Sequence, residues 1–466
     1  MKTHYQGLDL LRGLGIFILI WMHSAFYYFD GLYDLDFANP PPIVTLIGLM
    51  LMFAGLFAMI SGTAHGIQYF RKTGEQGYTR GKLLKYNTVN ALLMLAVAWL
   101  YFILTGPGLV DMANKTMNNS ILVDLIRNGI WKGFNLERFL YVDSLVMIGL
   151  NLLLLGPLFI LLNRRKHPTG IPILLNHRKH PTGIPNLLNR RKHPLPIPSL
   201  AGTSGKDPGK PASCPWLISG LAFFLLSLFR IPLYAVYTES FGQGRHGMTL
   251  LLNWLVNKNN PLMPYLSFGL LGAWMGFLLV RGDWKGMVRQ VLPVGTILLA
   301  AGVVLYVQLP DTMLERSIDG KWFSIMTAQL GLFLLLVLLM LRLFDFRKSG
   351  PVRKLPSGLA FLNRFGVAGL TAFFFESVVS ASIFRILRVF VPALSLDLPG
   401  SLLYGFSLAV LWGFLLILWE KRQYRYGIEY ALCRLLAPFG HSAKQDKLAR
   451  AGTVPVTSGS DAGEPS

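Results

Sequence analysis

Three ionisable residues lie in the first long apolar segment of the chain. Asp9 and Arg12 stand near its start, and His23 follows Arg12 after ten intervening residues. At 100° per residue, Arg12 and His23 share one face of a helix, about 16 Å apart along its axis. An imidazole can act as a general base or carry an acyl group, and a guanidinium can hold an anion or polarise a carbonyl. We therefore expect catalytic roles for His23 and Arg12, and a binding role for Asp9.

A structural interpretation of the same residues stays open. Asp9 and Arg12 can simply mark the end of a helix, and His23 can be a core histidine whose hydrogen bonds are satisfied. Ionisable groups inside a membrane-spanning helix cost about 2.5 to 3.5 kcal/mol each on insertion scales, and they usually face a protein interior or a wet cavity. This cost favours a functional role most strongly for His23.

The composition is that of a membrane protein. The 466 residues are 53% hydrophobic and 14% charged, with a mean hydropathy of +0.47. We expect an all-α, polytopic membrane helical bundle of about ten transmembrane helices, the first of them retained after synthesis. The predicted spans are 11–29, 42–66, 88–106, 142–162, 215–237, 262–280, 291–308, 323–343, 360–386 and 400–419.

Basic residues cluster in alternate loops and set the orientation of the chain. Arg71 and Lys72 follow the second span, whereas acidic residues such as Asp30 follow the first. The positive-inside rule then places both termini in the cytosol and the protein in the cell membrane. The net charge of +21 lies mainly in these loops, beside anionic lipid, so we expect no nucleic-acid partner. Cys214 and Cys433 have no neighbours at metal-ligand spacing, so no disulfide and no metal site is expected.

The chain divides into four parts. The first four spans occupy 1–162, and the remaining spans with a terminal cytosolic element occupy 215–435. Between them, 163–214 is a basic loop with a 13-residue Asn-Arg-Arg-Lys-His-Pro repeat, and prolines in every copy predict disorder. The tail 436–466 is also expected to be disordered. The charged stretch 121–139 predicts an amphipathic helix on the outer surface, in a position to roof a cavity.

Two further polar residues have two interpretations each. Asp143, at the outer start of the fourth span, either orients His23 as part of the catalytic group or sits in water. Ser61, in the second span, either donates a hydrogen bond to a substrate or belongs, with Gly62, to a contact between helices.

A polar patch on the ninth span adds three more binding candidates, Thr371, Glu376 and Ser377. An intramembrane glutamate is a functional candidate by default. The structural alternative is that Glu376 pairs with Arg364 or Arg385 near the ends of the same span.

The first span resembles the opening of the transmembrane acyltransferases. This group joins the acyltransferase family 3 proteins, which carry an arginine and a histidine with ten residues between them, with heparan-alpha-glucosaminide N-acetyltransferase-like and YeiB-like membrane proteins. Further similar stretches are Phe57–Gly62, Asp143–Leu150, Pro264–Gly276, Gly369–Ser377 and Tyr426–Arg434. The last two are similar to the YeiB-type branch, with Ala372, Glu376 and Ile428 in place of its asparagine, glutamine and proline.

The resemblance implies acyl transfer at the membrane. It implies acetyl-CoA drawn from the cytosol as the acyl donor, and a glycan or lipid that offers a hydroxyl or an amine as the acceptor. Two other classes of protein stay open from the residues alone. One is a transporter or flippase of an anionic substrate without bond chemistry, and the other is a structural or signalling membrane protein without a site.

Overall fold

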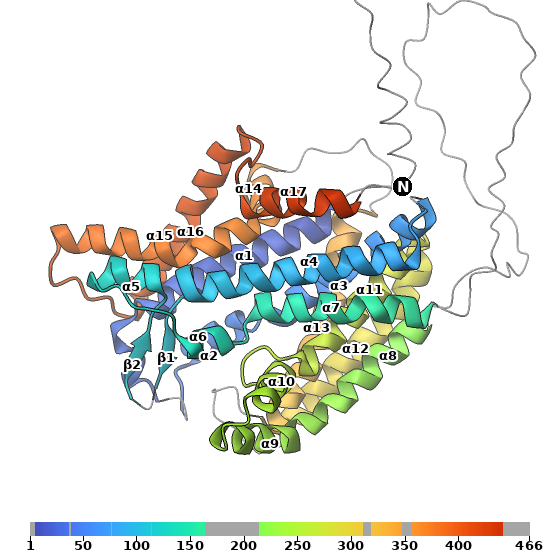
Figure 1. Cartoon of the computed structure of the whole chain (residues 1–466), viewed down its shortest axis with the longest axis horizontal. Coiled ribbons are helices and arrows are strands. Elements are labelled where there is room, and N and C mark those ends of the chain that lie inside the picture. The colour runs from blue at the N-terminus through green and yellow to red at the C-terminus, as the bar shows by residue number, and fades with distance from the viewer. Residues whose placement is uncertain are drawn as a thin grey trace, which may run out of the picture.

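The computed structural model describes residues 5–36, 39–75, 77–112, 114–163, 214–310, 318–346 and 356–440. Apart from its first residue, the predicted 13-residue repeat lies outside the described residues, as does the tail beyond Gly440. Within them the chain is an all-α polytopic bundle, and nine of its helices are long and apolar enough to span a membrane (Figure 1). The predicted fold class is therefore confirmed.

In chain order the elements are α1 (Gln6–Tyr27), η1 (Asp30–Asp34), α2 (Pro42–Leu51), α3 (Ala54–Phe70), η2 (Arg71–Glu75), α4 (Arg80–Leu100), η3 (Tyr101–Thr105), β1 (Leu109–Asp111), β2 (Thr116–Asn118), α5 (Ile121–Asn128), α6 (Leu136–Leu140), α7 (Ser144–Leu162), α8 (Cys214–Leu226), η5 (Ser227–Phe229), α9 (Arg230–Gly242), α10 (His246–Val256), α11 (Leu262–Val280), α12 (Trp284–Gln308), α13 (Gly320–Phe344), α14 (Ser357–Val367), α15 (Gly369–Phe390), α16 (Leu398–Glu420) and α17 (Ile428–Gly440).

We call the side at which α1 begins the inner side, and the opposite side the outer side. The inner side is the one predicted to be cytosolic. The terminal helix α17 lies on the inner side beside the start of α4, where the Lys85 ammonium stands 5.6 Å from the centre of the Phe439 ring. Because α17 continues to Gly440, the helix extends beyond the boundary at 435 that the sequence predicts for the ordered part.

Two predicted spans are interrupted by residues that belong to no helix. The span 42–66 is interrupted between α2 and α3, and the span 360–386 is interrupted between α14 and α15. At the second break Ala368 has non-helical angles, φ −115° and ψ 32°, and Glu429 accepts hydrogen bonds from the first backbone N–H groups of α15. Hydropathy cannot locate such breaks, because the residues on both sides of them are apolar.

The outer segment between α4 and α7 is more complex than the predicted single helix over 121–139. Only α5 and α6 are helical, and Gly129 ends α5 in the left-handed region, at φ +72°. A short hairpin of β1 and β2 precedes α5, with Val110 opposite Met117. We call the hairpin, α5 and α6 together the roof. They lie on the outer side of the bundle, where α5 packs against α15 and η3, and α6 packs against η3 (Figure 1).

The centre of the bundle is the pair α3 and α11, which pack along their whole lengths. Of the spanning helices, α11 is the most deeply buried, with 89% of its apolar window inside the protein. Small residues allow the two backbones to touch. A Cβ atom added at Gly62 would stand 2.0 Å from the Gly269 carbonyl oxygen, and one at Gly272 would stand 2.1 Å from the Met59 carbonyl oxygen.

This contact gives a stability prediction. Gly62→Leu forces α3 away from α11, because the new side chain meets backbone atoms that cannot rotate aside. We expect a loss of at least about 3 kcal/mol, and little folded protein after purification, as measured by size-exclusion chromatography and thermal unfolding. The matched control is Gly81→Leu, since a Cβ at Gly81 meets nothing within 4 Å. Equal behaviour of the two variants would show that the contact contributes little.

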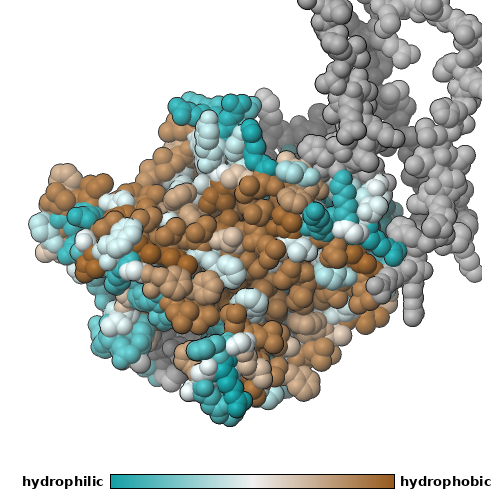
Figure 2. Space-filling model, in the orientation of Figure 1, coloured by the Kyte–Doolittle hydropathy of each residue, from teal (hydrophilic) through white to brown (hydrophobic). Residues whose placement is uncertain are grey.

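The outside of the bundle is apolar where lipid would surround it. Figure 2 shows apolar side chains over the flanks and hydrophilic side chains gathered at the loops and helix ends. The helix α12 illustrates this, because only 17% of its apolar window is buried and Ile297 and Val307 are 66% and 77% exposed. Exposure of such an apolar surface to water would carry a large free-energy cost, so these outward faces are suited to contact with lipid.

Candidate functional site

The ionisable residues of α1 point into the protein. Arg12, Ile16 and Leu19 line one cavity, and His23, which continues the same face, lines another. We call them the inner cavity and the outer cavity, after the ends of α1 near which they lie. Neither Arg12 nor His23 is therefore directed only at lipid.

The inner cavity has a volume of about 450 Å³ and is lined mainly by apolar side chains. It extends from Arg12, in the inner half of α1, to Ser144, the first residue of α7 on the outer side. Cys433 and Leu436 of α17 line it at the inner side of the bundle. A long, mostly apolar ligand could therefore enter from the inner side and reach deep into the bundle.

Several polar groups line the inner cavity, and the cationic one, Arg12, lies near its inner end. The Arg12 guanidinium donates to the carbonyl oxygen of Gly366 at 3.1 Å and stands 3.7 Å from the Asp9 carboxylate, and 37% of the Arg12 side chain is exposed. Ser61 and His65 line the cavity too, and the His65 Nδ1 donates to the Ser61 carbonyl oxygen at 2.7 Å. Arg12 thus keeps donors that a ligand can use.

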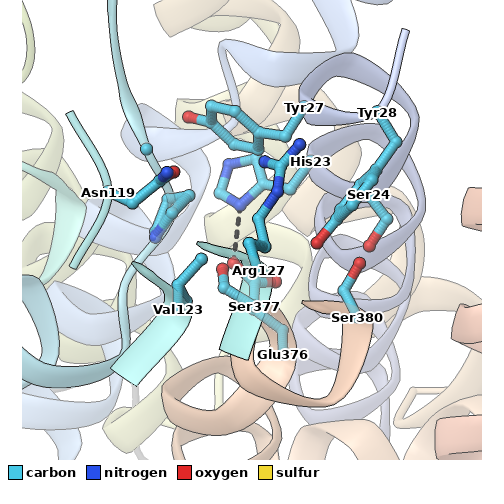
Figure 3. Close-up of a pocket in the computed structure, with 12 residues that line it drawn as sticks. His23, Ser24, Tyr27, Tyr28, Asn119, Val123, Arg127, Glu376, Ser377 and Ser380 are labelled. Carbon is cyan, nitrogen blue, oxygen red and sulfur yellow. Dashed lines mark hydrogen bonds and ion pairs between the residues drawn. The ribbon is translucent and has the colours of Figure 1, made fainter. Parts of the chain in front are cut away.

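His23 is held by a glutamate from the other end of the sequence. Its Nδ1 atom lies 2.7 Å from Oε1 of Glu376 on α15, a residue only 2% exposed (Figure 3). The hydroxyl of Tyr101, in η3, donates to the same oxygen at 3.1 Å. Of the alternatives left open by the sequence, pairing of Glu376 with Arg364 or Arg385 is therefore not the one observed.

This arrangement suits an imidazole that takes up a proton. With the Nδ1 proton donated to Glu376, the Nε2 lone pair points away from the carboxylate and is available as a base. No hydrogen-bond partner of Nε2 is found in the described residues. The carboxylate fixes the ring and stabilises the imidazolium that forms, as in other base-and-orienter pairs.

Two aromatic side chains separate the inner cavity from His23. Phe373 lines the inner cavity, and its ring centre lies 6.1 Å from that of His23 and 4.6 Å from that of Tyr101. Both aromatic residues are buried. We call Tyr101 and Phe373 the partition. His23 does not line the inner cavity, so we infer that an inner ligand contacts His23 only when the partition moves.

The other predicted site residues are dispersed. Ser377 lines the outer cavity beside Glu376. Asp143 is buried and caps the first turn of α7, where its Oδ1 accepts from the Val146 N–H at 2.9 Å. Asp143 therefore caps its own helix, and the group that orients the imidazole is Glu376.

Thr371 has a structural contact. Its hydroxyl donates to the Glu429 carboxylate and accepts from the Ile428 N–H at 2.8 Å. Because Glu429 also accepts from the first N–H groups of α15, the starts of α15 and α17 cap each other. Thr371 therefore holds α17 in place, and it is Glu429 that reaches the inner cavity.

Sequence reasoning missed Tyr101 and Arg127. Tyr101 is one aromatic residue in an apolar run, and nothing local distinguishes it from its neighbours. Arg127 belongs to α5, which the sequence does place on the outer surface, and it lines the outer cavity together with Val123. Its position over His23 depends on the docking of α5 against α15, where Arg385 donates to the carbonyl oxygens of Leu125 and Ile126.

The fold and this site define a class: a polytopic, all-α membrane protein with a part-buried histidine, paired with a buried glutamate, between two cavities. Across the described ranges, no three histidine, cysteine or acidic side chains gather as ligands for a metal ion. No model of a known protein family matches the chain, and no curated protein matches it.

Proposed function

We propose that this protein is an integral membrane acyltransferase of the cell membrane, which moves an acetyl group from cytosolic acetyl-CoA to a hydroxyl or amine of a glycan or lipid. The observation that carries the proposal is the pairing of the part-buried His23 with the buried Glu376, placed between a long inner cavity and a small outer one. An oriented base that lies between two cavities suits the transfer of a group between two substrates.

The inner cavity suits the donor. Its apolar length can hold an extended pantetheine arm, and cations at its inner end can hold phosphates. Arg12 is one such cation. Lys72 is a second, because its ammonium lies over the ring of Tyr86, which lines the cavity, at 2.8 Å from the ring centre. Burial lowers the pKa of Lys72 to about 7, and a bound phosphate would raise this pKa and favour the charged form.

The chemistry balances with the groups present. As the partition opens, His23 Nε2 takes the proton of the acceptor hydroxyl or amine, and the acceptor atom attacks the thioester carbonyl. The acyl C–S bond breaks and a C–O or C–N bond forms. The proton then passes from the imidazolium to the leaving thiolate, which departs as the free thiol of CoA.

A test of the proposal uses the purified full chain in lipid nanodiscs with acetyl-CoA. We expect release of free CoA thiol, measured with a thiol-reactive dye, and faster release when an extract of envelope glycans or lipids is added. A protein that binds no acetyl-CoA and releases no thiol with any extract would contradict the proposal.

The partition also suits the second candidate function, transport. Two cavities on opposite sides of a closed barrier are what a transporter of an anionic substrate would present. Flux of an anion into vesicles that contain the protein, without any acetyl-CoA, would favour this candidate over acyl transfer.

Lys72 provides a prediction on the donor side. We expect Lys72→Met to raise the KM for acetyl-CoA about tenfold and to leave kcat nearly unchanged, because the lost charge binds a part of the donor remote from the reacting bond. Steady-state rates of thiol release measure both constants. Lys285→Met is the control, since Lys285 is also on the inner side but is exposed at the start of α12. A fall in kcat at constant KM would place Lys72 outside donor binding.

A further inference from the structure

The outer cavity holds oxygen atoms that the pairing of His23 with Glu376 leaves unused. Asn119 Oδ1, Ser380 Oγ and Glu376 Oε2 are buried and have no hydrogen-bond partner in the described chain. The three residues are 7%, 2% and 2% exposed, and all three line this cavity (Figure 3). A buried polar atom without a partner costs about 1–3 kcal/mol. Three of them in one small space indicate a ligand that brings hydrogen-bond donors.

The size of the outer cavity limits what enters it. Its volume of about 20 Å³ has room for one water-sized group, which needs about 10–15 Å³. A hydroxyl fits this space, donating to one oxygen and accepting from another. The rest of such a molecule must lie outside the cavity, against the roof.

The roof presents an arginine at that place. Arg127 lines the cavity, its guanidinium lies 4.7 Å from the centre of the Tyr28 ring, and its Nη1 donates to the thioether of Met117 at 3.7 Å. Within the described residues, no carboxylate forms an ion pair with Arg127. A guanidinium has five N–H donors in a planar fork, so most of the donors of Arg127 remain available.

The other basic residues of the roof each have a partner within the protein. Lys115 pairs with Asp34 at 3.3 Å, and Lys132 pairs with Asp124 at 3.0 Å. Burial tends to raise the pKa of Asp124, but hydrogen bonds from Lys132 and two asparagines hold this pKa below its usual value. The third of these basic residues, Arg138, donates to three backbone carbonyl oxygens. Arg127 is therefore the cation of the roof that is left for an external anion.

We propose that the outer cavity selects an anionic, hydroxyl-bearing molecule. Arg127 binds its carboxylate or phosphate group, while one hydroxyl enters the cavity and bonds with Asn119, Ser380 and Glu376, next to His23. The inference rests on the proposed function in one respect, since it takes this molecule to be the acyl acceptor. Binding itself needs neither acetyl-CoA nor catalysis.

The test measures binding to the full chain in nanodiscs without acetyl-CoA, as the concentration-dependent rise in Tm. The probes are methyl β-D-glucuronide and its neutral counterpart methyl β-D-glucoside, together with glucose 6-phosphate and inorganic phosphate. We expect both anionic sugars to raise the Tm and the neutral glucoside to have no effect at equal concentration. A comparison of the Tm rise with the glucuronide and the Tm rise with glucose 6-phosphate, at equal concentration, shows whether a carboxylate or a phosphate is preferred.

Variants locate the binding. Arg127→Gln should weaken the binding of the anionic sugars about 10- to 100-fold, as expected for the loss of charged hydrogen bonds. Ser380→Ala should weaken binding without any change of charge. Lys115→Gln, in the same roof, should leave binding unchanged.

Three results would overturn the inference. Equal rises in Tm with the glucoside and the glucuronide would exclude selection by charge. A rise with inorganic phosphate equal to that with the anionic sugars would exclude the hydroxyl contact. Binding that survives both Arg127→Gln and Ser380→Ala places the ligand elsewhere. None of these measurements uses acetyl-CoA. Thiol release can therefore be observed without binding of the anionic sugars, and binding can be observed without thiol release, so the two proposals are tested separately.

Discussion

We expect His23→Gln to abolish the proposed acetyl transfer while the protein stays folded. Glutamine retains an N–H group that can donate to Glu376, so the buried carboxylate keeps a partner and the cost of an unpaired charge is avoided. It has no lone pair basic enough to take the proton of an acceptor. General-base catalysis contributes about 10²- to 10⁴-fold, and we expect kcat to fall by at least that much.

Glu376→Gln tests the same pair from the other side. The amide fills the same space and can accept from Nδ1, but it cannot stabilise the imidazolium. We expect a fall in kcat of about 10²-fold or more at unchanged KM for acetyl-CoA. The double variant should be no slower than the slower single variant, because a base and its orienter act as one unit.

The measurements are thiol release and acceptor acetylation, with Tm as the check on folding. Ser407→Ala is the control, since the Ser407 hydroxyl is exposed on α16 and bonds only within its own helix, to the Leu403 carbonyl oxygen at 2.8 Å. Full activity in His23→Gln would remove the proposed mechanism. Additive losses in the double variant would mean that Glu376 acts separately from His23.

Some of this site could be predicted from one segment of sequence. The spacing of Arg12 and His23 fixes them on one face of α1, because an α-helix has 3.6 residues per turn. The energetic cost of such residues in a membrane then predicts that the face points inward, where the structure places it. The fold class could be predicted for the same kind of reason, since long apolar segments in lipid must be helical.

The rest depends on contacts between distant segments. His23 and Glu376 are 353 residues apart in the sequence, and no local pattern chooses Glu376 over Asp143 as the partner of His23. The breaks at α2–α3 and α14–α15 are equally invisible, because hydropathy averages across them. At the second break, the N–H groups released are satisfied by Glu429, about 60 residues further along the chain.

Outside the bundle core, we expect substitution of Arg138 to lower the stability of the protein the most. It is only 2% exposed, and its guanidinium donates to the carbonyl oxygens of Phe102, Asn118 and Pro107 at 2.6, 2.6 and 2.8 Å. These oxygens belong to η3, to the hairpin and to the segment between them. One side chain thus joins the roof to the bundle.

We expect Arg138→Met to lower the free energy of unfolding by at least about 3 kcal/mol, because three buried carbonyl oxygens lose charged donors. Arg138→Lys should not restore stability, since a single ammonium cannot reach three oxygens in different directions. Burial lowers the pKa of Arg138 to about 10, which still leaves the guanidinium charged at neutral pH, so its contribution should be constant between pH 6 and about 8.

Both variants should also lose acceptor acetylation, because the roof carries Asn119 and Arg127 over the outer cavity. Limited proteolysis should cut them within residues 107–141, where the native protein resists. The control Lys115→Gln removes an exposed ion pair of the same roof, whose side chains are 63% and 76% exposed, and should cost less than about 1 kcal/mol. A roof that resists proteolysis in Arg138→Met would show that α5 is held mainly by its contact with α15, through Arg385, and not by Arg138.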